Sequence, residues 1–179
     1  MPLSQLNQMN RLSNDELLLN LESEFARERE ASHRILLYLL EMQSRRLFAD
    51  RGYSSMFTML IQHYRLSESA ANDRLRALEL ISAVPVAEEK FVANDLNLTT
   101  LAMAQRQIRR EEKVTGRKVT AEVKAEIVSR IAGKTQAQAE KELMTLLPAS
   151  AKEPRNTERR VSSESTRVNW TIRRFSLLT

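Results

Sequence analysis

The chain has 179 residues, of which 42% are hydrophobic and 28% are charged, and its formal net charge is +5. This length allows one domain with a substantial core. The absence of cysteine excludes disulfide scaffolds, thiolate zinc sites and cysteine nucleophiles. Three glycines and 5% aromatic residues argue against sandwiches, barrels and nucleotide-binding α/β folds. The longest apolar run, at 35–40, is far shorter than the roughly twenty residues that span a bilayer, and the start lacks a signal-peptide pattern. We therefore expect a cytoplasmic all-α protein with no membrane partner.

The first predicted helix opens with a capping box formed by Ser13 and Glu16. Apolar residues at helical spacing continue to the region before Gly52, interrupted by the charged stretch 27–30. An unbroken helix of this extent would be about 50 Å long, which exceeds the diameter of a small domain. Either it kinks near 27–32, or its first half projects and packs on a partner. We expect the first half of the helix to project from the domain, and the chain to form a homodimer through this helix.

Glycine and proline divide the following residues into shorter helices. The apolar patterns predict helices at about 53–64, 67–84, 86–93, 98–113, 120–132 and 135–147. Thr120 is a predicted N-cap, Gly133 a predicted C-terminal stop, and Thr135 with Gln138 forms a second capping box. The expected fold is a helical domain over 1–149 with about six or seven helices.

The segment at about 53–84 has the pattern of a helix-turn-helix. An apolar first helix is followed by a short turn at 65–67, and Ser67 is a natural N-cap for the second helix. In this motif the N-terminal part of the second helix enters the major groove, where Asn can bind adenine and Arg can bind guanine or a phosphate. Double-stranded DNA is therefore the predicted partner. The predicted DNA-binding side chains are Ser67, Ser69, Asn72, Arg74 and Arg76.

A second interpretation of the same pattern involves no DNA. Short helical hairpins are common in proteins that never bind DNA, and Glu68 and Asp73 would repel phosphates. The long, charged first helix supports this alternative. The alternative function is a helical self-association or protein-interaction module without direct DNA contact.

The positive charge is concentrated at the C-terminal end. Residues 1–149 carry 21 Lys and Arg against 20 Asp and Glu, whereas residues 150–179 carry seven cations and three acids. The composition of 150–179 predicts a basic linker or the truncated start of a further segment. Its Arg155, Arg159 and Arg160 are candidate phosphate contacts that would act independently of DNA sequence. The alternative is a solvated linker.

Several short blocks occur in an order that is typical of one bacterial family. They are GYSSMF at 52–57, LSESAA at 66–71, RLRA at 74–77, LNLTTL at 96–101, REEK at 110–113, GKT at 133–135, AEKEL at 139–143 and TRVNWT at 166–171. Over about 13–172 the chain resembles the N-terminal helical region of HNH-endonuclease-like proteins and, more distantly, the helix-turn-helix DNA-binding region of ParB-type partition proteins. The resemblance implies a DNA-binding module. Asn72 departs from the aromatic residue of many relatives, which leaves any base preference open.

The resemblance does not extend to the family's catalytic motif. An HNH nuclease needs histidines and an asparagine around one divalent metal, and members carry that motif downstream of the matched region. The two histidines, His33 and His63, have no histidine or cysteine neighbour in the sequence. After 171–172 the sequence departs from the family, as a truncated or shortened relative would. We expect no catalytic residue, no metal ligand, no cofactor and no nuclease activity.

Overall fold

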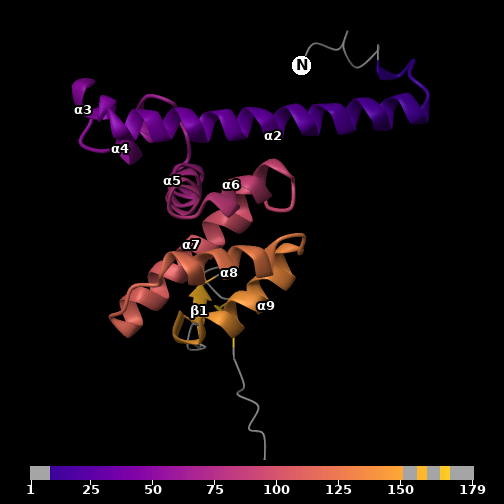
Figure 1. The fold of residues 1–179 in the computed structure, drawn as a ribbon. Helices are drawn as coiled ribbons and strands as arrows, with labels where there is room; N and C mark the ends of the chain where they lie inside the picture. Colours follow the sequence, from indigo (N-terminus) through magenta and orange to yellow (C-terminus); the bar gives the residue numbers. More distant parts are fainter. Residues whose placement is uncertain (1–8, 151–156, 161–165, 170–179) are drawn as a thin grey trace, which may run out of the picture.

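A computed structural model describes residues 9–150, 157–160 and 166–169 (Figure 1). Within these residues the fold is all-α apart from one short hairpin, which confirms the predicted class. The helices are α2 (Asn14–Ser44), α3 (Leu47–Asp50), α4 (Met56–Gln62), α5 (Glu68–Ala83), α6 (Pro85–Val92), α7 (Leu98–Thr115), α8 (Ala121–Ile131) and α9 (Gln136–Leu146). A 3-10 turn, η1 (Pro148–Ser150), follows α9.

Short hydrogen-bonding signals set the helix ends, as the sequence predicted. The capping boxes at Ser13 and at Thr135 are both present. Thr120 caps α8, and Gly133 follows that helix with a φ of 70°, a left-handed value that suits glycine. The largest difference is in the first helix, which ends at Ser44 instead of continuing to the region before Gly52, because Arg46 takes a left-handed φ of 55° and the separate helix α3 follows. Helix α4 also begins later than predicted, since Ser55 caps it by accepting from the N–H of Thr58.

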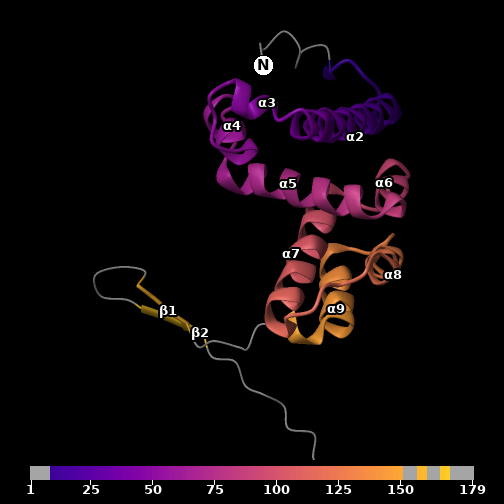
Figure 2. The same cartoon turned by 60° about the vertical axis from the view of Figure 1, so that its left-hand side comes forward.

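The helices stack in an elongated order from α2 at one end to α8 and α9 at the other. In Figures 1 and 2, α5 and α6 lie between α2 and α7, and α7 leads to the α8–α9 pair. Helix α5 is central because it packs against α2, α4, α6 and α7. The segment predicted as a recognition helix is therefore also a main supporting element of the fold.

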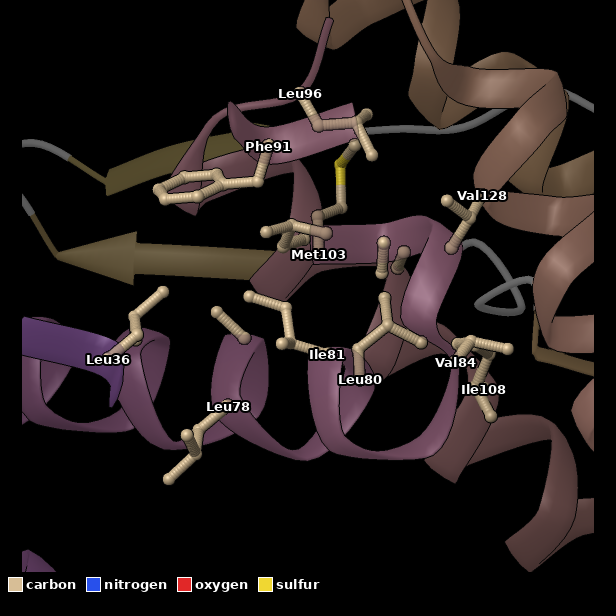
Figure 3. Packing of buried hydrophobic residues seen from close by; sticks show 14 of the residues in the cluster. Leu36, Leu78, Leu80, Ile81, Val84, Phe91, Leu96, Met103, Ile108 and Val128 are labelled. Atoms are coloured by element: carbon tan, nitrogen blue, oxygen red, sulfur yellow. The ribbon is translucent and has the colours of Figure 1, made fainter. Parts of the chain in front are cut away.

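The centre of the core is built from the apolar face of α5. Ala71 and Ala77 are fully buried, and their small side chains allow neighbouring helices to approach closely. Figure 3 shows Leu80 and Val84 directed toward Ile108 of α7, where the core continues toward α8. Burying a large aliphatic side chain stabilises a fold by about 1.5–3 kcal/mol, so this continuous cluster holds the stack together.

Helix α2 is unbroken, so the predicted alternative of a kink near 27–32 is wrong. Its 31 residues correspond to about 46 Å. Its C-terminal half buries Leu36 and Leu39, whereas every residue from 13 to 30 is exposed. The first half thus projects from the domain, as expected (Figure 1).

The basic tail contains the hairpin. Strands β1 (Thr157–Arg160) and β2 (Thr166–Asn169) pair antiparallel, with Thr157 opposite Asn169. This pairing was not apparent from the sequence, because four-residue segments are too short for a periodic pattern. Ser150 is buried and still belongs to the helical domain. No helix in the described part of the chain is long and apolar enough to cross a membrane.

Candidate nucleic-acid interface

Helix α4, the turn at 63–67 and α5 form the two-helix unit that was expected to bind DNA. The Leu66 N–H donates to the Leu60 carbonyl at 3.1 Å, and Arg65 takes a left-handed φ of 57°. Ser67 caps α5 as predicted, since its Oγ accepts from the N–H of Ala70 at 3.2 Å. The turn is two residues longer than the sequence indicated because α4 ends earlier. Ser67 and Ser69, at the start of α5, are exposed.

Three of the predicted DNA-binding residues share one face of α5. Ser69, Asn72 and Arg76 follow each other at spacings of three and four, which places them on one side of a helix. Ser69 is exposed, and the other two are half-buried. We call these three residues the α5 polar face.

The two longer side chains of this face bond within their own helix. The Asn72 Nδ2 donates to the Glu68 carbonyl at 2.9 Å, and Arg76 lies 3.5 Å from the Asp73 carboxylate. Partly exposed ion pairs of this kind contribute about 0–1 kcal/mol. Both side chains can therefore exchange these bonds for contacts to a ligand at low cost.

Arg74 does not belong to this face. Its Nη1 donates to the Ala70 carbonyl at 3.1 Å, and its side chain lines a groove with Tyr38 of α2 and Tyr64. A rotation of about 100° per residue puts position 74 well away from both 72 and 76. The sequence prediction that grouped Arg74 with Asn72 and Arg76 is therefore not matched by the geometry.

The structure reveals a cationic surface that the sequence analysis missed. Arg106, Arg109, Arg110 and Lys113 of α7 have the spacing of one helix face, and all but the half-buried Arg110 are exposed. We call them the α7 basic stripe. Arg109 pairs with Glu79 of α5 at 2.5 Å, so the stripe adjoins the second half of α5.

The missed signal was present in the sequence. Residues 106–118 carry six cations against two acids, but a charge count over 1–149 averages them with the acids of other helices. A search for cations at spacings of three, four and seven would have found the stripe.

A polar hollow of about 460 Å³ lies at the C-terminal end of the stripe. It is lined by Glu79, Arg109, Glu112, Lys113, Gly116, Arg117 and Lys118. Burial alone would raise the pKa of Glu112, but the Val119 N–H at 3.0 Å and the Lys118 ammonium at 3.2 Å hold that pKa below its ordinary value. Glu112 is therefore ionised at neutral pH and offsets one of the surrounding cations.

The two histidines occupy separate parts of the domain. His33 of α2 donates from Nε2 to the Glu88 carboxylate of α6 at 2.8 Å and so joins the two helices. The ring of His63 lies beside Tyr53 and Tyr64. Among the described residues, no three His, Asp or Glu side chains are grouped closely enough to hold a metal ion.

The candidate residues of the tail lie partly outside the described residues. Arg159 and Arg160 belong to β1, and Arg159 is opposite Arg167 in the register of the hairpin. Arg155 lies outside the described residues. The backbone of the tail thus brings at least two arginine positions to neighbouring strands.

Comparison of the chain with protein-family models, curated proteins and solved structures finds no match. The resemblance to HNH-endonuclease-like proteins stays a prediction from short sequence blocks.

Proposed function

We propose that this protein binds double-stranded DNA through α5 and α7 together. The observation that carries the proposal is the contact between Arg109 and Glu79, which joins the α7 basic stripe to the side of α5 that bears the polar face. A base-reading helix needs adjacent phosphate contacts, because these set its register on the duplex. The α7 basic stripe supplies cations at that position.

The α5 polar face and the α7 basic stripe contribute differently to DNA binding in this proposal. Asn72 and Arg76 offer the donors that read adenine and guanine edges in the major groove. The exposed Arg106 and Lys113 neutralise phosphates and contribute affinity without base preference. Glu68 lies in the first turn of α5 and weakens binding to any phosphate there, so we expect moderate affinity.

The phosphate contacts are tested by titrating labelled duplex DNA at several salt concentrations. Replacing Arg106 and Lys113 by Ala together removes two exposed cations without touching the core. If each contacts a phosphate, the slope of log K against log salt falls by about two. Lys141→Ala is the matched control, since Lys141 is an exposed cation on α9 and its loss leaves the slope unchanged. Equal binding by the double variant and the control would refute a role for the stripe.

Base reading is tested separately on α5. Asn72→Ala and Arg76→Ala each weaken binding to a preferred site by about 1–3 kcal/mol and leave non-specific binding unchanged. A tail deletion after Ser150 weakens binding to every sequence equally. If the α5 variants bind as the parent does and only the deletion abolishes binding, the hairpin of α4 and α5 is structural and the tail binds DNA.

The proposal includes no nuclease activity and a cytoplasmic location. Incubation of supercoiled plasmid with the purified chain and Mg²⁺ or Mn²⁺ should leave the plasmid intact. Metal-dependent nicking that is lost in His63→Ala would contradict this part.

The alternative, a self-association module without DNA contact, is favoured by one observation of its own. The projecting half of α2 exposes several large apolar side chains. Exposed apolar patches of this kind mark interaction sites.

A further inference from the structure

The projecting half of α2 carries an apolar stripe with no partner in the described structure. Leu17, Leu18, Leu21 and Phe25 are each between 45% and 59% exposed. Their spacing places them on one side of the helix, in line with the buried Leu39 further along. We call these four residues the α2 stripe. Four large apolar side chains in water on one helix face are unfavourable for a chain that stays alone.

The other half of α2 borders an apolar groove. Ile35, Tyr38, Leu39 and Met42 form one wall, and Leu60, Tyr64, Leu66 and Arg74 form the other. The hollow between them measures about 500 Å³, and its lining is mostly apolar. Tyr38 and Tyr64 are 71% and 49% exposed at its mouth. We call this hollow the α2–α4 groove.

The two halves of α2 differ in charge. Residues 14–26 contain four acids and no cation, whereas residues 27–44 contain three arginines and three glutamates, and Arg45 and Arg46 follow directly after the helix. Arg74 adds a further cation to the wall of the α2–α4 groove. The half that bears the stripe is thus acidic, and the half that bears the groove is neutral but has Arg45, Arg46 and Arg74 beside it. A helix of this kind is complementary to a second copy of itself that runs in the opposite direction.

We propose that a second copy of this chain covers both surfaces, by antiparallel pairing of the α2 helices about a two-fold axis near Arg29. Arg29 is the midpoint of Asn14–Ser44. An axis there brings residue 21 opposite residue 37 of the partner, so the α2 stripe of each copy enters the α2–α4 groove of the other. The same operation brings Asp15 close to the partner copy of Arg45. The axis passes through 27–30, where Arg and Glu alternate, so that Arg29 of one copy lies one residue away along the helix from Glu28 and Glu30 of the other.

The area of this interface comes close to that of a stable one. Specific interfaces bury about 800 Å² from each partner. A helix face about 46 Å long and about 10 Å wide, together with the groove wall from α4, approaches this value. The contact is isologous, so one patch serves both copies and the assembly closes as a dimer.

Pairing through α2 goes beyond the proposed function and is compatible with it. Arg74 faces the groove, whereas the α5 polar face points away from it, so the second copy leaves Asn72 and Arg76 accessible. A two-fold dimer would present two such helices to one duplex. Because the association involves no DNA, it is measured without DNA, and its failure says nothing about DNA binding.

The first experiment measures the mass of the full chain by light scattering and sedimentation over a range of concentrations. We expect a dimer. Leu21→Glu with Phe25→Glu should raise the dissociation constant by at least about a hundredfold, because both copies lose apolar contacts and gain repulsion. Both positions are exposed in the monomer, so the fold is retained. The control is Leu19→Glu, which lies on the opposite side of α2, is 65% exposed and should leave the dimer intact.

The second experiment determines the direction of pairing by cross-linking. The chain has no cysteine, so single cysteine variants report one position each. Glu28→Cys lies close to the axis and should form a disulfide with its own copy. Leu21→Cys should not do so, because its two copies would be about 24 Å apart along the helices. A mixture of Leu21→Cys and Tyr38→Cys chains should form the mixed disulfide.

Three outcomes would overturn the proposal. A monomer at all concentrations would mean that the α2 stripe serves a different partner or a segment of the same chain. A dimer that survives Leu21→Glu with Phe25→Glu would place the interface elsewhere. A disulfide between two Leu21→Cys chains, without the mixed product, would show that the helices run parallel.

Discussion

Replacing Gln105 by Met should stabilise this protein. Gln105 lies on α7, only 1% of its surface is exposed, and its Oε1 has no hydrogen-bond donor among the described residues. A buried acceptor without a partner costs about 1–3 kcal/mol, whereas a side chain of similar length without polar atoms carries no such penalty. Methionine adapts to the same space and has a helix propensity close to that of glutamine. Allowing for imperfect packing, we expect a gain of about 1 kcal/mol in the free energy of unfolding.

The gain is measurable by thermal and urea unfolding of the Gln105→Met chain. For a domain of this size, 1 kcal/mol corresponds to a rise of about 2–4 °C in Tm, with the urea m-value unchanged. Gln136→Met, at an exposed position of α9, is the control and should change stability by less than about 0.5 kcal/mol. A lower Tm for Gln105→Met would refute the reasoning. It would show that the Gln105 amide makes a hydrogen bond whose stabilisation exceeds the free-energy penalty of burying the amide.

Three further changes probe the packing, the caps and the pH dependence. Ile108→Ala, at a fully buried position of α7, should cost about 2–5 kcal/mol in urea unfolding, and a loss under 1 kcal/mol would contradict the packing between α5 and α7. Thr135→Ala removes the cap of α9 and should cost about 1 kcal/mol, whereas Thr135→Ser should restore most of it. Hydrogen bonds from Lys134 at 2.6 Å and Arg130 at 2.8 Å lower the pKa of Glu142 in the folded chain. The ionised Glu142 therefore stabilises the fold above the unfolded pKa of about 4.3, and this stabilisation is lost as the pH falls through the lower folded pKa. Glu142→Gln should therefore lose less stability than the parent between neutral pH and about pH 3. An identical pH profile for the two chains would argue against these ion pairs.

At the predicted DNA-binding interface, the sequence predicted local features but not the contacts between distant residues. The sequence placed Ser67 correctly as a cap, because capping depends on atoms only three residues away. It included Arg74 among the predicted DNA-binding residues, whereas the packing of α5 between α2 and α7 directs Arg74 into the groove. The contact of Arg109 with Glu79 joins residues thirty positions apart, so no local pattern predicts it.

The sequence by itself determined the all-α class and the N-terminal helix ends at Ser13, Thr120 and Thr135, and it favoured projection of the first helix, which the unbroken α2 then decided. Each depends on hydrogen bonds within one turn, on periodicity within one helix, or on helix length compared with the size of a domain. Only the tertiary structure decided which side of α5 stays polar and accessible, and where the α7 basic stripe and the α2–α4 groove are. Helices that are distant in the sequence form those surfaces. The packing of their apolar faces decides which helices meet, and this packing is a property of the whole fold.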